Sequence, residues 1–339
     1  MFVFSPSSIQ LEIAPLLNGS LNQRSLNLLH WYRDQFDALD VRVSTSPCGA
    51  SLYDFGTSHP GTLLGGRLLA EVCLAGLAEV QLTQCNLADN FLPAIQITTD
   101  HPLQACIAGQ YAGWPVSGTK YFAMGSGPAR LLRGREPMLE QLQLQEESEV
   151  AVLVLEAAKL PADELLASLA SECRVTPHNL HVAVARTASL AGLIQIVARS
   201  VETTLHKLFE LGFDLRSVRS AVGWAPLPPV PANDLLGIGW SNDAILFGGR
   251  SHLFVETEDA LLEPLKGRLT SDSSPDFGAP FIEIFERYER DFYRIDKLLF
   301  SPAQTTICNL RTGRVFTAGQ LHVERLLRSF GLKSETPAG

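Results

Sequence analysis

The stretch RTASLAGLIQIVARSVETTLHKLFELG, residues 186–212, decides the fold of the region around it. Thr187 or Ser189 can cap the start of a helix, and Gly212 can end it. Between these residues, apolar side chains recur every three or four positions and form a broad hydrophobic face. The residues of this face are Leu190, Leu193, Ile194, Val197, Val201, Leu205 and Leu208. The spacing predicts one helix packed against the core.

A narrow polar stripe lies opposite this hydrophobic face. With about 100° of rotation per residue, one side of the helix carries Gln195, Arg199, Glu202, His206 and Glu210. The stripe has two interpretations: a solvated surface with an ordinary Arg–Glu ion pair, or a catalytic acid–base pair that lines a cleft. The helix taken alone favours the solvated surface.

The composition is typical of a globular protein that is long enough for two domains. The chain has 339 residues, of which 46% are hydrophobic and 19% charged, and its net charge is −9. No basic run alternates with aromatic residues, which argues against nucleic-acid binding. The six cysteines lack Cys-x-x-Cys spacing, no run approaches the roughly 18 apolar residues of a membrane span, and the first residues do not form a secretory signal. We expect a cytoplasmic protein with reduced thiols and no membrane contact.

Strand-like and helix-like patterns alternate along the chain. Strands are expected at 41–46, 91–99, 120–124, 151–157, 181–185, 219–224 and 305–309. A leading helix with polar breaks is expected over 8–40, of which 21–36 is the periodic part. Further helices are expected at 67–80, 103–113, 162–172, 234–238 and 280–288, with a solvated connecting helix at 133–149 and a hairpin at 244–256. This order predicts an α/β (mixed α+β) fold with two α/β domains, 1–140 and 141–339, a pocket in the cleft between them, and a tail that packs back on the first domain.

Two short motifs have both a structural and a functional interpretation. Gly125-Ser126-Gly127-Pro128 follows a strand, and its glycines would let backbone N–H groups approach an anion, but the run is neither a P-loop nor a G-x-G-x-x-G and could be a tight turn. Ser241-Asn242-Asp243 stands between an expected helix and an expected strand, where it could make a turn or bond a heterocycle. His178 and His181 have no third residue at metal-ligand spacing, so we expect no metal site.

Ten strings, kept in order, resemble one family, the methenyltetrahydromethanopterin cyclohydrolases. They span about residue 20 to residue 325, nearly the whole chain. The strings are CGASLYDFG (48–56), EVCLAGLAEV (71–80), YFAMGSGPAR (121–130), TASLAG (187–192), ARSVETTLHKL (198–208), APLPPVPANDL (225–235), SNDAILFGG (241–249), DFGAPFIEIF (276–285), DFYRIDKLLFSPAQ (291–304) and TGRVFTAG (312–319).

The resemblance implies an enzyme of one-carbon metabolism. Such enzymes reversibly hydrolyse the cationic 5,10-methenyl form of tetrahydromethanopterin to its N5-formyl form. The resemblance also implies two α/β domains with a pocket between them, a homotrimer, and no metal or separate cofactor, because the pterin derivative is the substrate. Production of the formyl form would suit formaldehyde oxidation in methylotrophy, and the reverse reaction would suit carbon dioxide reduction, so the physiological direction stays open.

The catalytic pair implied by the resemblance is Arg199 and Glu202, within the string ARSVE. We expect Glu202 to be the general base that activates water and Arg199 to hold and tune its carboxylate. The expected substrate-binding residues are Gly125, Ser126 and Gly127 of the turn, Asn242 and Asp243 of the polar run, and Gln195 and His206 of the helix stripe.

Departures from the family pattern keep other functions in view. Arg186 stands where the family commonly has proline, Ser200 and Thr204 are less typical, and residues 133–149 match nothing in the family. One alternative is a non-catalytic or weakly active paralogue that binds a reduced pterin, against which the retained Arg199 and Glu202 argue. Another is a cyclohydrolase of tetrahydrofolate, but folate cyclohydrolases have a different fold and a lysine-centred site.

Overall fold

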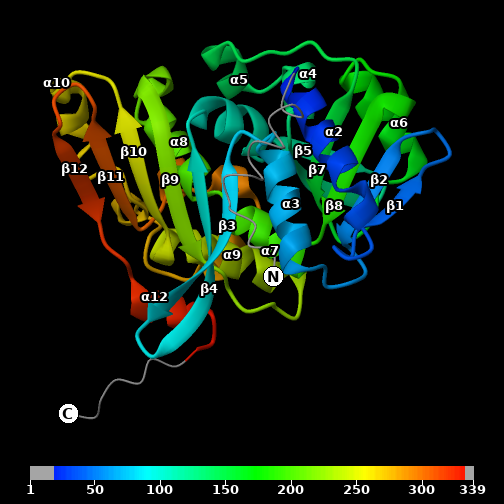
Figure 1. Ribbon diagram of the computed structural model, residues 1–339. Coiled ribbons are helices and arrows are strands. Elements are labelled where there is room, and N and C mark those ends of the chain that lie inside the picture. The colour runs from blue at the N-terminus through cyan, green and yellow to red at the C-terminus, as the bar shows by residue number, and fades with distance from the viewer. Residues whose placement is uncertain (1–18, 333–339) are drawn as a thin grey trace, which may run out of the picture.

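The computed structural model describes residues 19–332, which form two six-stranded sheets with helices between and around them (Figure 1). The first sheet has the order β1 (Arg42–Thr45), β2 (Ser51–Gly56), β8 (Leu180–Ala185), β7 (Ala151–Glu156), β6 (Tyr121–Ser126) and β5 (Trp114–Gly118). The second has the order β12 (Val315–Gly319), β11 (Gln304–Asn309), β10 (Arg250–Val255), β9 (Val218–Pro226), β4 (Asn90–Thr99) and β3 (Glu79–Leu87). The expected mixed α/β class is confirmed.

The centre of the first sheet is parallel and almost fully buried. β2 pairs with β8 and β8 pairs with β7, both in parallel. Every residue of β8 is buried, and so are the first five of β7. Continuous apolar runs of this kind are typical of strands covered on both faces, and they explain why the expected strands at 151–157 and 181–185 are found.

Each sheet takes strands from both halves of the chain. The first sheet combines strands before residue 127 with β7 and β8, and the second combines β3 and β4 with strands after residue 217. The domain boundary expected near residue 140 stays a prediction. The strands before residue 140 are divided between the two sheets, and so are the strands after it.

The helices between the sheets carry the largest hydrophobic core. α3 (Leu63–Cys73), α7 (Leu190–Val197), α8 (Ser200–Glu210), α9 (Asp234–Gly248) and the π-helix η3 (Leu103–Gln110) contribute residues to it. The apolar face of residues 186–212 packs here, with Leu193, Val201 and Leu205 fully buried together with strand residues of the second sheet. α2 (Leu21–Trp31), α6 (Asp163–Glu172), α4 (Ala129–Arg133), α5 (Pro137–Leu142), α10 (Asp259–Leu262), α11 (Phe281–Arg287) and α12 (Val323–Ser329) complete the fold.

The single helix expected at 186–212 is wrong, because the stretch forms two helices. α7 ends at Val197, α8 begins at Ser200, and Arg199 has φ −89° and ψ 13°. Ser189 caps α7 as expected, by accepting a hydrogen bond from the Gly192 amide. The apolar spacing continues on both sides of the break, so periodicity alone did not reveal it.

The hairpin expected at 244–256 is also wrong. Residues 234–248 form the single helix α9, and the strand β10 starts only at Arg250. Ile245, Leu246 and Phe247 are buried inside α9. A short apolar run does not distinguish a strand from a buried helix, which accounts for the error. Residues 133–149 likewise contain only short helical pieces, and the expected helix at 67–80 ends at Cys73, before β3.

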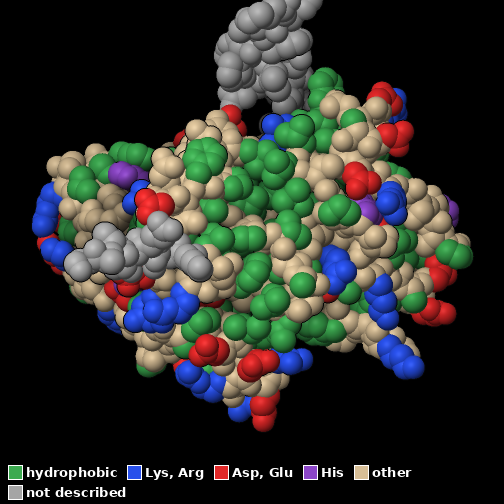
Figure 2. Space-filling model, turned by 90° about the horizontal axis from the view of Figure 1, so that it is seen from below, with side chains coloured by type: hydrophobic (Ala, Val, Ile, Leu, Met, Phe, Trp, Pro, Cys, Tyr) green, Lys and Arg blue, Asp and Glu red, His purple; other side chains and the backbone are tan. Residues whose placement is uncertain are grey.

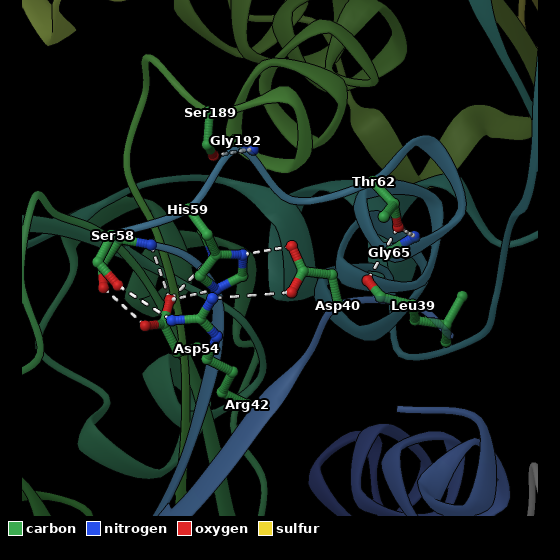
Figure 3. A network of polar contacts seen from close by, with 12 residues as sticks. Leu39, Asp40, Arg42, Asp54, Ser58, His59, Thr62, Gly65, Ser189 and Gly192 are labelled. Carbon is green, nitrogen blue, oxygen red and sulfur yellow. Dashed lines mark hydrogen bonds and ion pairs between the residues drawn. The ribbon is translucent and has the colours of Figure 1, made fainter. Parts of the chain in front are cut away.

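A polar network fixes the loop that follows β2 (Figure 3). Asp54 is the acceptor at its centre: Oδ1 accepts hydrogen bonds from the Gly56 and Thr57 amides at 2.9 and 2.7 Å, and Oδ2 accepts one from Thr57 Oγ1 at 2.7 Å. His59 Nδ1 lies 2.8 Å from Asp40 Oδ2.

This loop in turn holds the start of α7. The Leu190 amide donates to the Pro60 carbonyl at 2.7 Å, and the Arg186 amide donates to the Gly56 carbonyl at 3.2 Å. The N-terminal end of α7 is therefore held against the loop.

Candidate active site

A cavity of about 170 Å³ lies where the first sheet meets α8 and α9. Its wall combines the ends of β6 and β7, the α7–α8 break, α8, α9 and a segment near residues 292–300. The lining residues are Tyr111, Ala112, Met124, Glu156, Ile196, Arg199, Glu202, Thr203, His206, Ile238, Asn242, Ile245, Phe292, Tyr293, Lys297 and Phe300. A larger hollow of about 550 Å³ adjoins it and shares Met124, Glu156, Ile238, Phe292 and Tyr293 with it. The end of the first sheet and the helices α8 and α9 thus meet at one pocket.

Arg199 is buried at this pocket, with 7% of its surface exposed, and its partners differ from the expected one. Its Nη2 donates to Glu156 Oε1 at 2.5 Å and to Gln195 Oε1 at 2.9 Å, while Gln195 Nε2 donates to Glu156 Oε1 at 3.1 Å. The three side chains close a ring of hydrogen bonds. Within residues 19–332, no salt bridge joins Arg199 to Glu202. Arg199 acts on Glu202 through its charge, and the carboxylate that it contacts is Glu156.

Glu202 lies in the first turn of α8 and is only 4% exposed. Burial raises the pKa of its carboxyl to about 7, while Arg199 and Arg130 oppose this rise and Glu156 adds to it. No side-chain hydrogen bond to Glu202 is present in the described part of the chain. A carboxyl with this pKa can both accept and donate a proton near neutral pH.

An aromatic surface flanks the carboxylates. The rings of Tyr111 and His206 stack with their centroids 5.4 Å apart and their planes 17° from parallel. Burial lowers the pKa of His206 to about 4, so its ring is neutral at physiological pH, and burial raises the pKa of Tyr111 above its ordinary value. The guanidinium of Arg130 lies 5.2 Å from the Tyr111 ring centroid. These flat, uncharged rings are suited to a planar heterocycle.

The turn at 125–127 lies next to the cavity, but none of its residues lines it. The cavity is lined by the preceding residue, Met124. The Gly127 amide donates to the Gly109 carbonyl at 2.7 Å, and a Cβ at Gly127 would stand 2.9 Å from the Val152 carbonyl oxygen, so the glycine permits close packing. Ser126 Oγ contacts Cys73 Sγ at 3.3 Å, and Gly125 is buried in β6. The turn packs η3 against the sheet.

The polar run in α9 divides between the pocket and the core. Asn242 lines the cavity, although its side-chain amide donates to the Ile238 carbonyl at 2.8 Å. Asp243 is fully buried elsewhere: it accepts hydrogen bonds from the Phe281 amide at 2.9 Å and from Ser329 Oγ at 2.5 Å. Consecutive residues of a helix point in directions about 100° apart, so only one of this pair faces the cavity.

The structure brings Arg199, Glu202, His206 and Asn242 of the expected residues to the cavity wall, and Gln195 lies directly behind Arg199. Sequence reasoning missed Glu156 and the cavity-lining residues of 292–300, including Lys297. Glu156 had a signal: it is the only charged residue of the buried run AVLVLE, at the end of a central strand. Residues 292–300 belong to the string DFYRIDKLLFSPAQ, which resembles the family, but nothing in their spacing assigned them to the site.

The described residues contain neither a metal-binding cluster nor a membrane-spanning helix. Within residues 19–332, no three or more His, Cys, Asp or Glu side chains are grouped so that they could hold a metal ion. None of the helices in that range is both long and apolar enough to cross a bilayer.

Comparisons with known proteins agree with the family resemblance. A family model described as Cyclohydrolase (MCH) matches residues 20–330. A methenyltetrahydromethanopterin cyclohydrolase of Rhodopirellula baltica is 45% identical over 323 residues, which cover 94% of this chain and 92% of the relative. Enzymes of the same name are 40% identical in Methylobacillus flagellatus, over 92% of this chain and 95% of theirs, and 42% identical in Methanothermobacter marburgensis, over 87% and 94%.

Proposed function

The chain belongs to the methenyltetrahydromethanopterin cyclohydrolase family, and from this premise we propose that it reversibly hydrolyses 5,10-methenyl-tetrahydromethanopterin to the N5-formyl form. The observation that carries the proposal is the Glu202 carboxyl, buried at a pocket between sheet and helices with its pKa raised to about 7 by that burial. Such a group can take a proton from water beside a cationic substrate.

The reaction then proceeds by two proton transfers through Glu202 and the release of a further proton to solvent. Glu202 accepts one proton of the attacking water as the oxygen bonds to the amidinium carbon. The same proton passes to the departing nitrogen as the C–N bond breaks. The second water proton leaves when the carbonyl forms, so hydrolysis releases one proton overall.

Arg199 supplies a donor in this scheme. Its Nη2 is engaged by Glu156 and Gln195, whereas its Nε has no hydrogen-bond partner in the described part of the chain. An unpaired buried donor costs free energy unless a ligand satisfies it. We assign an N–H of this guanidinium, which lines the cavity, to the substrate oxygen that forms from water.

The shape of the site supports a pterin with an extension. The Tyr111–His206 stack offers a flat surface beside Glu202, which suits a fused heterocycle. The adjoining hollow of about 550 Å³ has Phe122, Phe285 and Tyr293 in its wall and gives room for the rest of the substrate. No separate cofactor is needed in this scheme, because the pterin is both substrate and carrier.

One assay tests the proposal against its alternatives. The purified protein is mixed with methenyl-tetrahydromethanopterin, and the loss of the methenyl chromophore is followed by absorbance, with methenyl-tetrahydrofolate in parallel. We expect rapid loss with the first substrate only. Tight binding without turnover would support the pterin-binding paralogue, and turnover of the folate alone would support the folate enzyme.

The cellular setting and the assembly are proposals of the same kind. We propose a cytoplasmic homotrimer in one-carbon metabolism, working in formaldehyde oxidation. Figure 2 shows hydrophobic side chains gathered over the face seen from below, a surface that could contact another subunit. Leu64, Phe91 and Val230 are among the exposed apolar residues of the chain. Light scattering after size-exclusion chromatography measures the subunit number.

A further inference from the structure

We propose that Glu156 is a positioning residue of this reaction, which holds Arg199 in place and balances its charge so that Glu202 is left as the proton-carrying carboxyl. The inference rests on the proposed function and extends it to a residue outside the expected Arg199–Glu202 pair. It starts from a contact: the guanidinium of Arg199 is hydrogen-bonded to Glu156 and has no salt bridge to Glu202 within the described residues.

Glu156 is placed rigidly. It is the last residue of β7, whose other five residues are buried, and Met124 of β6 pairs beside it in the sheet. Its side chain lines both the smaller cavity and the adjoining hollow. A side chain at the end of a central strand varies little in position, which is what precise placement of a catalytic group requires.

Gln195 fixes the orientation of the contact between Glu156 and Arg199. Its amide donates to the same Glu156 oxygen that accepts from Arg199, and its own carbonyl oxygen accepts from Arg199 Nη2. The two acceptors together fix Nη2, and Nε of Arg199 is buried without a hydrogen-bond partner in the described part of the chain. The backbone of Arg199 is held in the break between α7 and α8, since its amide donates to the Ile196 carbonyl at 3.1 Å and its carbonyl accepts from the Thr203 amide at 2.8 Å, while the contacts to Glu156 and Gln195 set the position of its guanidinium.

The charges around Glu202 give Glu156 a second effect. Titratable groups from several elements surround the Glu202 carboxyl. Those of opposite or like charge are Arg199 from the α7–α8 break, Arg130 from α4, Lys297 from the segment that closes the cavity, and Glu156 from β7. The remaining groups are His206 from the same helix, Tyr111 and Cys106 from η3 and its end, and Tyr293 beside Lys297. Among all these groups, Glu156 is the negative group that opposes the pull of Arg199 and Arg130 on the Glu202 proton. Without it, Arg199 would be an uncompensated cation and would lower the pKa of Glu202.

The test is a pH profile of Glu156→Gln. This variant keeps the shape and removes the charge. We expect the acid limb of kcat/KM for hydrolysis to move to lower pH by roughly 0.5–1 unit, and turnover at the optimum to fall roughly 10–100-fold because Arg199 is misplaced. Glu156→Asp keeps the charge but shortens the reach by one methylene, so turnover should fall while the limb stays in place.

Glu172→Gln is the matched control, because Glu172 pairs with Arg133 and does not line the cavity. The Glu172→Gln enzyme should keep the wild-type pH of the acid limb and the wild-type turnover. A Glu156→Gln enzyme whose limb stays at the wild-type pH would overturn the proposal, whatever its turnover. If circular dichroism shows that Glu156→Gln is unfolded, Glu156→Asp decides, and wild-type turnover in that variant would overturn it.

These results are separable from a failure of the proposed function. Full turnover in Glu202→Gln would show that Glu202 is not the base, and inactivity of the wild-type protein would show that the substrate is wrong. Neither result depends on a substitution at Glu156.

Discussion

The two ends of α7 use buried polar groups in opposite ways. At its N-terminal end, both carboxylate oxygens of Asp54 accept hydrogen bonds from Gly56 and Thr57, and the loop they fix anchors the helix. At its C-terminal end, Arg199 Nε has no hydrogen-bond partner, and no side-chain hydrogen bond reaches the Glu202 carboxylate within residues 19–332. The Asp54 carboxylate holds the backbone of its loop, whereas the Glu202 carboxylate, which lines the cavity, holds no backbone group in the described part of the chain.

The substitution Glu202→Gln should give the largest effect on turnover. Loss of the general base is expected to lower kcat by roughly 10²–10⁴-fold, measured as the rate of methenyl absorbance loss. The wild-type enzyme should show a hydrolysis rate that rises with pH through about 7, because burial raises the pKa of Glu202 to about 7 and the base must be ionised.

The Glu202→Gln variant should keep its fold, and the direction of its change in stability follows from the raised pKa of Glu202. The folded protein holds the Glu202 proton up to about pH 7, while the unfolded chain releases it near the ordinary glutamate pKa of 4.5. Ionisation therefore destabilises the fold progressively as pH rises through this window. Above pH 7, Glu202→Gln removes this cost, and its unfolding temperature should equal or exceed that of the wild type. A sharply lower unfolding temperature would make Glu202 a structural residue.

The substitution Asp54→Ala should have the converse effect at the other end of α7. It leaves the Gly56 and Thr57 amides without their acceptor, which we expect to lower the free energy of unfolding by roughly 1–3 kcal/mol. Denaturant titration measures this loss. Asp54→Asn, which keeps one carbonyl oxygen, should lose less. Turnover per folded molecule should be unchanged in both, and a fall matching that of Glu202→Gln would erase the distinction between the two ends.

The substitution His206→Phe should give the smallest effect. The pKa of His206, lowered to about 4 by burial, means that the ring does not change its protonation near neutrality, so the acid limb should stay near pH 7. Phe keeps the stack on Tyr111. His206→Ala removes one ring of the surface on which the heterocycle is proposed to stack, and the loss of such a ring contact to the substrate, roughly 0.5–1.5 kcal/mol, would raise KM about 2- to 12-fold. Steady-state kinetics of both variants measure this difference. Movement of the limb in His206→Phe would show that His206 titrates in the reaction.

The sequence predicted those parts of the fold that depend on local pattern. The buried strands β7 and β8 were visible as apolar runs, and Ser189 was visible as a cap. The α7–α8 break was not visible, because the apolar face continues across it. The helix α9 was read partly as a strand, because Ile245 to Phe247 are buried on all sides and carry no periodicity.

The site was predictable only as far as neighbours in sequence could show it. Arg199, Glu202 and His206 share one stripe and line one cavity. The Glu156–Arg199 contact joins residues 43 positions apart, and only the sheet brings them together. Asp243 was expected beside Asn242 at the pocket, but the helix directs it to the Phe281 amide instead.

Each sheet takes strands from both halves of the chain, and this arrangement also governs when the protein can fold. Thr98 of β4 lies opposite Val222 of β9, and Ser51 of β2 lies opposite His181 of β8. At a synthesis rate of 5–20 residues per second, β4 waits roughly ten seconds for its partner to leave the ribosome. The β3–β4 hairpin meanwhile presents an open edge, the kind of surface that aggregates during synthesis. The cavity takes part of its wall from residues as far along the chain as Phe300, so it is complete only when nearly nine-tenths of the chain has been made.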